Sequence, residues 1–324
     1  MMKFQAGNAQ EKDYLHFITR FGVPIIFVAM VIVFTSMNPV FFSFANLTDL
    51  LYSTAASGIA VIGTSIVLIS GGLDLSLSSI MFGAGSITAL TANANFPAPL
   101  VVLIAIVAGG LMGAVNGFFI ARWKMTPLLV TLATQAIYRG LWLVAINEGY
   151  LHISNDFYNQ FVQSKFLGLT PSVYLFGALA ILFHLIMTKT KYGWHLYAIG
   201  NNIEASRKIG INTKRIQFSA YMLNGLFCGL AGFILVSMIG EISPSFALGN
   251  EFTMITGAVL GGIALTGGKG KIFPGAALGA LMIYTIDNGL NIISANPYAY
   301  TIVRGLVIFV AVALDRVYYV GELR

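Results

Sequence analysis

Long apolar runs separated by short polar breaks dominate the sequence from residue 21 onward. A helix needs about 20 mainly apolar residues, within a range of about 17–25, to cross a bilayer. About ten runs approach this length: 21–37, 51–70, 76–92, 98–120, 127–147, 172–188, 217–239, 252–267, 274–293 and 298–314. The pattern predicts an all-α fold, a polytopic membrane helix bundle of about ten transmembrane helices that forms a single transmembrane domain over residues 1–324.

The composition supports a membrane protein and excludes an ordinary soluble domain. Hydrophobic residues make up 57% of the chain and charged residues 9%, with a mean hydropathy of +0.82. Soluble domains are about 25% charged, so too few charged side chains remain here to cover a soluble surface. The lone Cys228 lies inside an apolar run and is expected to be a small buried residue.

The distribution of basic residues sets the expected orientation. If the N-terminus is cytoplasmic, Lys165 alone among the 18 basic residues falls in an outer loop, and Arg139 and Arg304 fall within spans. The others lie in cytoplasmic segments, as the positive-inside rule requires. The sequence therefore predicts cytoplasmic N and C termini, an outer loop at 148–171 and a cytoplasmic loop at 189–216. This distribution explains the net charge of +6 without a nucleic-acid partner.

The sequence shows no grouping typical of an enzyme or a metal site. The 4 histidines are scattered without an H-x-x-x-H pattern, so no metal site and no catalytic residue is predicted. The stretch GGIALTGGKGK at 261–271 departs from a phosphate loop, because Ile263 replaces the first Gly and Gly270 replaces the final Ser or Thr. No cofactor is expected on this chain, and any ATP must bind another subunit. The few deep carboxylates, Asp74 and Asp287, weaken an ion-coupled mechanism.

The stretch SGGLDLSLS at 70–78 interrupts an apolar region with two glycines and an acid. Gly71 and Gly72 are expected to end the second span, and Asp74 can cap the next helix, whose dipole favours an acid there. A second interpretation is a broken helix that forms part of a gate, since non-helical backbone at membrane depth is tolerated only inside protein or beside a water-filled cavity. The sequence leaves both interpretations open.

The long cytoplasmic loop contains a predicted short helix at 202–209. Asn201 or Asn202 can cap its start, Glu204 lies in its first turn, and Gly210 can end it. Such a helix is either a solvated connection between two spans or a lever that docks onto another protein.

Four stretches resemble signatures of the ABC-importer permeases of the ribose/xylose/galactose class. They are YAIGNNIEASRKIGINTKRI (197–216), SGGLDLSLSS (70–79), ITGAVLGGIALTGGKGKIFPGAALGA (255–280) and TIVRGLVIFVAVALDR (301–316). The match runs over most of residues 45–316. The chain departs from the usual motifs at Leu77-Ser78 and after Gly267, which bears on the exact sugar and not on the class.

The resemblance implies a permease subunit that imports a monosaccharide or a similar polyol across the bacterial cytoplasmic membrane. In that family two permease copies pair as a homodimer or heterodimer. Two ATPase domains carrying ATP and Mg bind the cytoplasmic face, and an extracytoplasmic sugar-binding protein delivers the substrate. The resemblance places coupling to the ATP-binding subunit in the loop helix, at Glu204, Ala205, Ser206, Arg207 and Gly210.

Other substrates and another class of transporter remain as alternatives. A furanosyl signalling molecule and branched-chain amino acids are substrates of similar permeases. A stand-alone ion-coupled transporter is the alternative from a different class, and it would need no partner ATPase.

Polar residues within the predicted spans are candidates for the substrate path, because such residues face the bundle interior or a cavity. They share one face of the fifth and ninth spans, with one more on the seventh: Thr131, Gln135, Arg139, Tyr284, Asp287, Asn288, Asn291 and Asn224. Each either lines the path or holds helices together. Asp287 is also predicted to pair with Arg304, with Arg139 as the competing partner, because similar depth on adjacent antiparallel helices allows an ion pair.

Small residues recur at helical spacing and predict close helix packing. The sets are Gly109, Gly113 and Gly117; Gly225 and Gly229; Gly257 and Gly261; and Gly275 and Gly279. In addition, the stretches 69–85 and 265–281 align without gaps, with Gly71 opposite Gly267 and Gly72 opposite Gly268. This similarity raises the hypothesis of an internal repeat, which is common in transporters.

Overall fold

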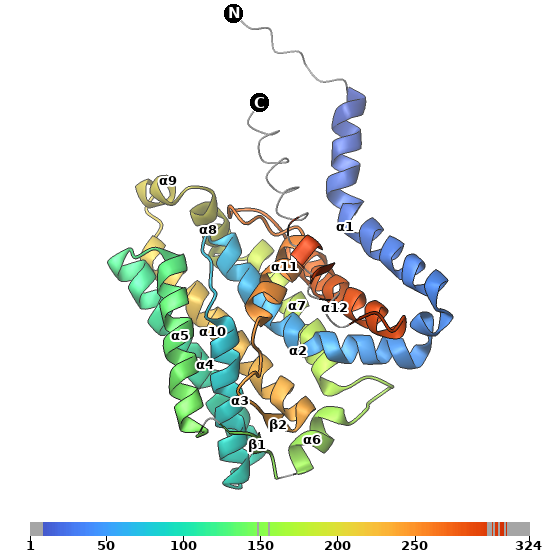
Figure 1. Cartoon of the computed structure of the whole chain (residues 1–324). Coiled ribbons are helices and arrows are strands. Elements are labelled where there is room, and N and C mark those ends of the chain that lie inside the picture. The colour runs from blue at the N-terminus through green and yellow to red at the C-terminus, as the bar shows by residue number, and fades with distance from the viewer. Residues whose placement is uncertain are drawn as a thin grey trace, which may run out of the picture.

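The computed structural model describes residues 9–147, 149–154 and 156–296, together with 300, 302–303, 305–307 and 309. Helices make up nearly all regular structure in this part of the chain (Figure 1). The helices are α1 (Ala9–Met37), α2 (Phe44–Ile69), α3 (Leu77–Asn93), α4 (Ala98–Trp123), α5 (Pro127–Ala145), α6 (Asp156–Gln163), α7 (Pro171–Lys189), α8 (Lys191–Asn201), α9 (Ile203–Lys208), α10 (Thr213–Ile239), α11 (Asn250–Leu260) and α12 (Ala277–Ile292). Two short helical turns, η1 (Pro39–Phe42) and η2 (Ile272–Ala276), and two strands, β1 (Leu151–His152) and β2 (Glu241–Ile242), complete the fold. The predicted all-α membrane bundle is confirmed.

Five of the described helices are long and apolar enough to cross a membrane, namely α2, α4, α5, α7 and α10. The apolar part of α1 is shorter and covers Gly22–Met37. Each predicted span from 21–37 to 274–293 overlaps a helix. The last predicted span, 298–314, lies largely outside the described residues, so the count of ten spans stays a prediction.

Some element boundaries differ from the prediction. α1 begins at Ala9, so this helix starts well before the predicted span 21–37. α11 ends at Leu260 and not near 267, because two glycines follow it and Gly262 adopts a left-handed φ of +82°. The predicted outer loop at 148–171 contains β1 and α6.

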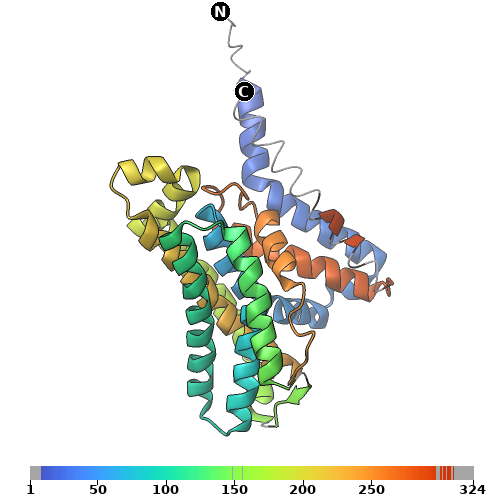
Figure 2. The same cartoon turned by 60° about the vertical axis from the view of Figure 1, so that its left-hand side comes forward.

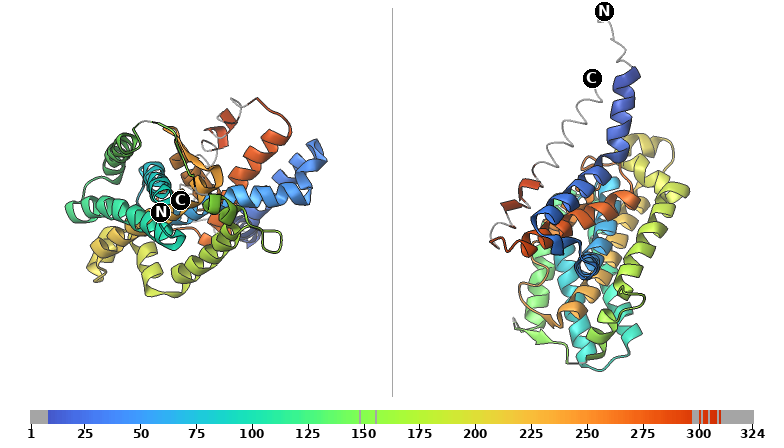
Figure 3. Two further views of the ribbon diagram at one scale, coloured as in Figure 1. Left: turned by 90° about the horizontal axis from the view of Figure 1, so that it is seen from below. Right: turned by 90° about the vertical axis from the view of Figure 1, so that its right-hand side faces the viewer.

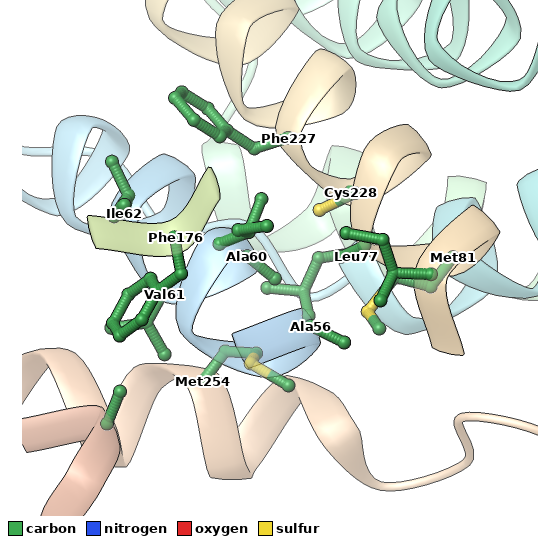
Figure 4. Close-up of a cluster of buried hydrophobic side chains, with 14 of the residues drawn as sticks. Ala56, Ala60, Val61, Ile62, Leu77, Met81, Phe176, Phe227, Cys228 and Met254 are labelled. Atoms are coloured by element: carbon green, nitrogen blue, oxygen red, sulfur yellow. The ribbon is translucent and has the colours of Figure 1, made fainter. Parts of the chain in front are cut away.

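α2 is the central helix of the bundle, and its residues from Thr54 to Ile69 are all buried. It contacts α7, α10, α11 and α12, which surround it in the end-on and side views of Figure 3. Figure 4 shows its small residues Ala56 and Ala60 close to side chains from neighbouring helices, including Cys228 of α10 and Met254 of α11. Cys228 is fully buried, as predicted.

The glycine spacing explains the closest helix pairs. α4 and α10 pack backbone against backbone: a Cβ atom added to Gly109 would lie 2.4 Å from the carbonyl oxygen of Gly225. α11 and α12 approach similarly, since a Cβ on Gly279 would lie 1.9 Å from the carbonyl oxygen of Gly257. The predicted role of these glycines in close packing is confirmed.

The two ends of the bundle differ in charge and structure. We call the end that carries α8, α9 and the links 124–126 and 261–271 the basic end, because the Lys and Arg residues of these segments gather there (Figure 1). The opposite, far end carries α6 and the antiparallel pair of β1 and β2, in which Leu151 faces Ile242 and His152 faces Glu241. The N–H of Ile153 extends this pairing by donating to the carbonyl of Gly240 at 2.9 Å.

Candidate functional site

The acid of the SGGLDLSLS stretch lies in a buried network that we call the inner polar cluster (Asp74, Ser76, Asn116 and Asn224). Asp74 is 1% exposed. Its Oδ1 accepts from the Ser76 N–H at 2.9 Å and from the Ser76 hydroxyl at 2.7 Å, and its Oδ2 accepts from the Asn224 amide of α10 at 3.0 Å. The Asn116 amide of α4 donates to the Ser76 hydroxyl at 2.7 Å. The cluster therefore joins the start of α3 to α4 and α10 through hydrogen bonds alone.

This geometry corrects the predicted capping role of Asp74. The N-cap of α3 is Ser76, and no side chain caps the first turn. Residues 70–76 form a non-helical link between α2 and α3, visible in Figure 1, and most of them are buried. Because Asp74 accepts from Ser76, two residues along the chain, and from Asn224 on α10, it stabilises both the local turn and the contact of this buried break with a distant helix. Whether the break acts as a gate stays a prediction.

Three main-chain segments meet at the basic end in a contact that we call the glycine junction (Gly71, Gly200, Gly267 and Gly268). The N–H of Gly268 donates to the carbonyl of Ile69 at 2.9 Å. A Cβ atom on Gly200 would lie 1.9 Å from the carbonyl oxygen of Ile69, and one on Gly267 would lie 2.8 Å from the Cα of Gly71. Gly71, Gly267 and Gly268 also adopt positive φ angles of +78°, +89° and +70°. Only glycine fits these positions without displacing the backbone.

The glycine junction connects the end of α2 to α8, the helix directly before α9. The Tyr197 hydroxyl of α8 donates to the carbonyl of Gly270 at 2.7 Å, and burial raises the pKa of Tyr197 above its usual value, so it remains a donor. The two stretches of the proposed internal repeat touch here, Gly71 against Gly267. The common origin of these stretches stays a hypothesis.

Two of the predicted path residues meet a third polar residue toward the far end, in a group that we call the outer polar cluster (Gln135, Arg139 and Glu251). The Gln135 amide donates to the Glu251 carboxylate at 3.1 Å. Arg139 donates through Nη2 to the carbonyl oxygens of Pro244 at 2.5 Å and Phe246 at 3.2 Å. The cluster therefore brings α5, the start of α11 and the segment between β2 and α11 together.

The other predicted path residues lie elsewhere. Tyr284 of α12 is hydrogen-bonded to Ser57 of α2, and Asn288 exchanges two amide hydrogen bonds with Asn46, at 2.8 and 2.9 Å. These contacts join α12 to α2. Thr131 is buried and donates to its own helix, and Asn291 is exposed.

The predicted pair of Asp287 and Arg304 lies partly outside the described residues, because Arg304 does. Arg139, its predicted competitor, donates to the backbone near β2 instead. The structure thus leaves the pair as a prediction.

The predicted loop helix is present as α9. Asn202 caps it by accepting from the Ala205 N–H at 2.9 Å, and Gly210 ends it with φ of +87°. Glu204 and Arg207 form an exposed ion pair at 3.2 Å on its surface. Ser206 is buried and donates to the Asn202 carbonyl at 2.8 Å. The helix, its cap and its terminating glycine are confirmed, whereas the proposed coupling role of these residues is untested.

Several contributing residues were not predicted as site candidates, among them Asn116, Glu251 and Gly200. Asn116 is an amide within an apolar span, so the rule that selected Asn224 also applies to it. Glu251 directly precedes the predicted span 252–267, and nothing local in the sequence indicates its contact with Gln135. Gly200 had no sequence signal, because its contacts come from segments distant along the chain.

Comparison with known proteins identifies the family. The model described as branched-chain amino acid transport system / permease component matches residues 46–312. The chain belongs to this permease family. No solved structure gives a significant match.

Relatives of this permease align over nearly their whole length. The ribose import permease of Escherichia coli K12 is 31% identical, with 90% of this chain and 92% of the relative covered. The L-arabinose transport system permease of the same strain is 34% identical, with 92% and 90% covered. The ribose import permease of Bacillus subtilis is 33% identical, with 94% and 96% covered. The resemblance to monosaccharide ABC permeases seen in the sequence is confirmed, and the chain is a multi-pass membrane transport subunit.

Proposed function

We propose that this permease is the membrane subunit of an ATP-powered importer for a monosaccharide or a similar polyol in the bacterial cytoplasmic membrane. The observation that carries the proposal is the near full-length similarity to permeases named for ribose, L-arabinose and D-allose. The absence of a phosphate-loop motif in the sequence fits a division of labour in which a partner subunit binds ATP and Mg.

The proposal includes an orientation. We place the basic end in the cytoplasm, because Lys and Arg concentrate on the cytoplasmic side of membrane proteins. About ten spans with both termini inside would then put β1, β2 and α6 on the outer face. An extracytoplasmic sugar-binding protein would land there, and a second permease copy would complete the path.

The proposal assigns α9 as the contact with the ATP-binding subunit. It projects at the basic end, and Glu204, Arg207 and Gly210 are largely exposed, while Ser206 anchors the helix (Figure 1). α8 links it to the glycine junction, which gives a backbone route from α9 to the end of α2.

Transport assays test the function. Proteoliposomes that contain the permease, its partner ATPase and sugar-loaded binding protein should accumulate a labelled monosaccharide only with ATP inside. Uptake without a partner ATPase that collapses with an uncoupler, while ATP is maintained, would instead establish the ion-coupled alternative. Uptake of leucine or of a furanosyl signalling molecule, with no sugar uptake, would assign the other substrates.

A variant in α9 tests the coupling role. Glu204→Lys reverses the charge in the first turn and breaks the ion pair with Arg207, yet it should leave membrane insertion intact because the pair is exposed. We expect ATPase association, measured by co-purification, to fall severalfold. Lys191→Glu on α8 is the matched control for charge reversal at the basic end. Wild-type association and uptake in Glu204→Lys would remove α9 from the coupling contact.

A further inference from the structure

The outer polar cluster contains two charged groups with unmet hydrogen-bonding capacity. Arg139 and Glu251 have opposite charges, yet they form no direct ion pair in the described part of the chain. Nη1 of Arg139 and Oε2 of Glu251 are buried and have no partner among the described residues. Leaving a buried polar group unpaired costs about 1–3 kcal/mol, and more for a charged group. The cluster therefore lacks one acceptor and one donor.

One aromatic ring, from a packed cluster that contains three aromatic residues, lies against Arg139 of this unmatched pair. The Arg139 guanidinium lies 4.8 Å from the ring centre of Phe82, and Phe82, Phe246 and Trp142 belong to one packed cluster. Glu251 is 6% exposed, whereas Arg139 and Gln135 are partly exposed. A few polar groups set among aromatic rings are typical of small-molecule sites.

A sugar supplies what the cluster lacks. Each hydroxyl group both donates and accepts a hydrogen bond, so hydroxyls on neighbouring carbons can bind the guanidinium and the carboxylate together. A cation would bind Glu251 but would be repelled by Arg139, and an anion would meet the reverse problem.

We propose that the outer polar cluster is a contact site for the hydroxyl groups of a monosaccharide within the translocation path. The inference rests on the proposed sugar-import function. Because Arg139 also donates to the carbonyls of Pro244 and Phe246, the same residue binds the sugar and holds the far-end segment that leads into α11 (Figure 2).

Fluorescence of Trp142 gives a direct measurement of binding. The chain has 3 tryptophans, and the other two, Trp123 and Trp194, lie at the basic end. In a Trp123→Phe, Trp194→Phe background, the purified permease–ATPase complex should show a saturable fluorescence change with the transported monosaccharide. 1,4-Dioxane, an uncharged ether without hydroxyl groups, should give none at equal osmolality.

Variants of the cluster sharpen the test. Glu251→Gln should raise the apparent dissociation constant about tenfold, because a hydrogen bond to a charged group is lost. Gln135→Ala, which leaves both charges in place, should raise it less. Glu241→Gln is the matched control, since this acid pairs with His152 at the far end, outside the cluster.

The outcomes separate this inference from the proposed function. A wild-type importer that transports the sugar, with no saturable Trp142 signal or with unchanged affinity in both cluster variants, would overturn the contact site and leave the function standing. A wild-type importer that transports no monosaccharide would overturn the function. If Glu251→Gln does not fold, Gln135→Ala decides the case.

Discussion

The inner and outer polar clusters each contain a buried carboxylate that forms no ion pair within the described part of the chain, but the two carboxylates differ in how many hydrogen bonds they accept. Asp74 accepts three hydrogen bonds, two from Ser76 and one from Asn224. Glu251 accepts one from Gln135, and its second oxygen is unpaired among the described residues. We infer that the inner acid holds three helices in place, whereas the outer acid is available to a ligand.

The packing around the inner polar cluster is also tighter than the packing around the outer polar cluster. Near Asp74, the glycine junction brings main chains into direct contact with no intervening side chain. Near Glu251, an arginine side chain spans from α5 to the carbonyls of a loop. Backbone contacts tolerate little displacement, and a long side chain can release its partner and bind again. Substitutions in each region can therefore test whether the inner cluster is structural and the outer cluster is available to a ligand.

The largest effect on stability is expected at the glycine junction. Gly200→Ala puts a methyl group against the Ile69 carbonyl and the Gly268 N–H, so the loss should reach or exceed the upper end of the about 1–3 kcal/mol that overpacking costs. Thermal unfolding in detergent measures it. Gly177→Ala in α7 is the control, since nothing lies within 4 Å of its added Cβ. Equal melting temperatures for the two variants would show that the close contact does not exist.

An intermediate loss is expected at Asp74. Asp74→Ala leaves the Asn224 amide and the Ser76 hydroxyl without their acceptor, and relief of the buried charge offsets part of the cost, for a net loss of about 2 kcal/mol. Asp74→Asn keeps one acceptor oxygen and should lose less. In the double variant with Asn224→Ala, the losses should be less than additive in the same unfolding assay, because the two residues contact each other. Strict additivity would contradict the inner network.

The smallest effect on stability is expected at Glu251. Glu251→Gln keeps an acceptor for Gln135 and removes an incompletely matched charge, so the free energy of unfolding should change by less than about 1 kcal/mol. The same thermal assay compares it with Asp74→Ala. A loss as large as that of Asp74→Ala would identify Glu251 as a structural residue, and the two carboxylates would then have the same role.

Local features were predictable from the sequence, and features that depend on distant partners were not. The Asn202 cap and the Gly210 stop of α9 depend on neighbouring residues, and both are present. The periodicity of α5 correctly placed Gln135 and Arg139 toward the protein, but their neighbour Glu251 lies beyond α10 in the chain. The predicted cap at Asp74 is wrong, because the N-cap of α3 is Ser76, and one donor to Asp74, the Asn224 amide, lies 150 residues away.

The short pairing of β1 with β2 joins two segments of the far end that are distant along the chain. Hydrogen bonds and the His152–Glu241 pair join the segment that contains β1 to β2, the strand that precedes Pro244. A displacement of the β1 segment would therefore also displace β2 and the Pro244 carbonyl to which Arg139 donates. If a binding protein docks on this face, as proposed above, its contact with the loop would reach the guanidinium of Arg139 through β2 and the carbonyls of Pro244 and Phe246.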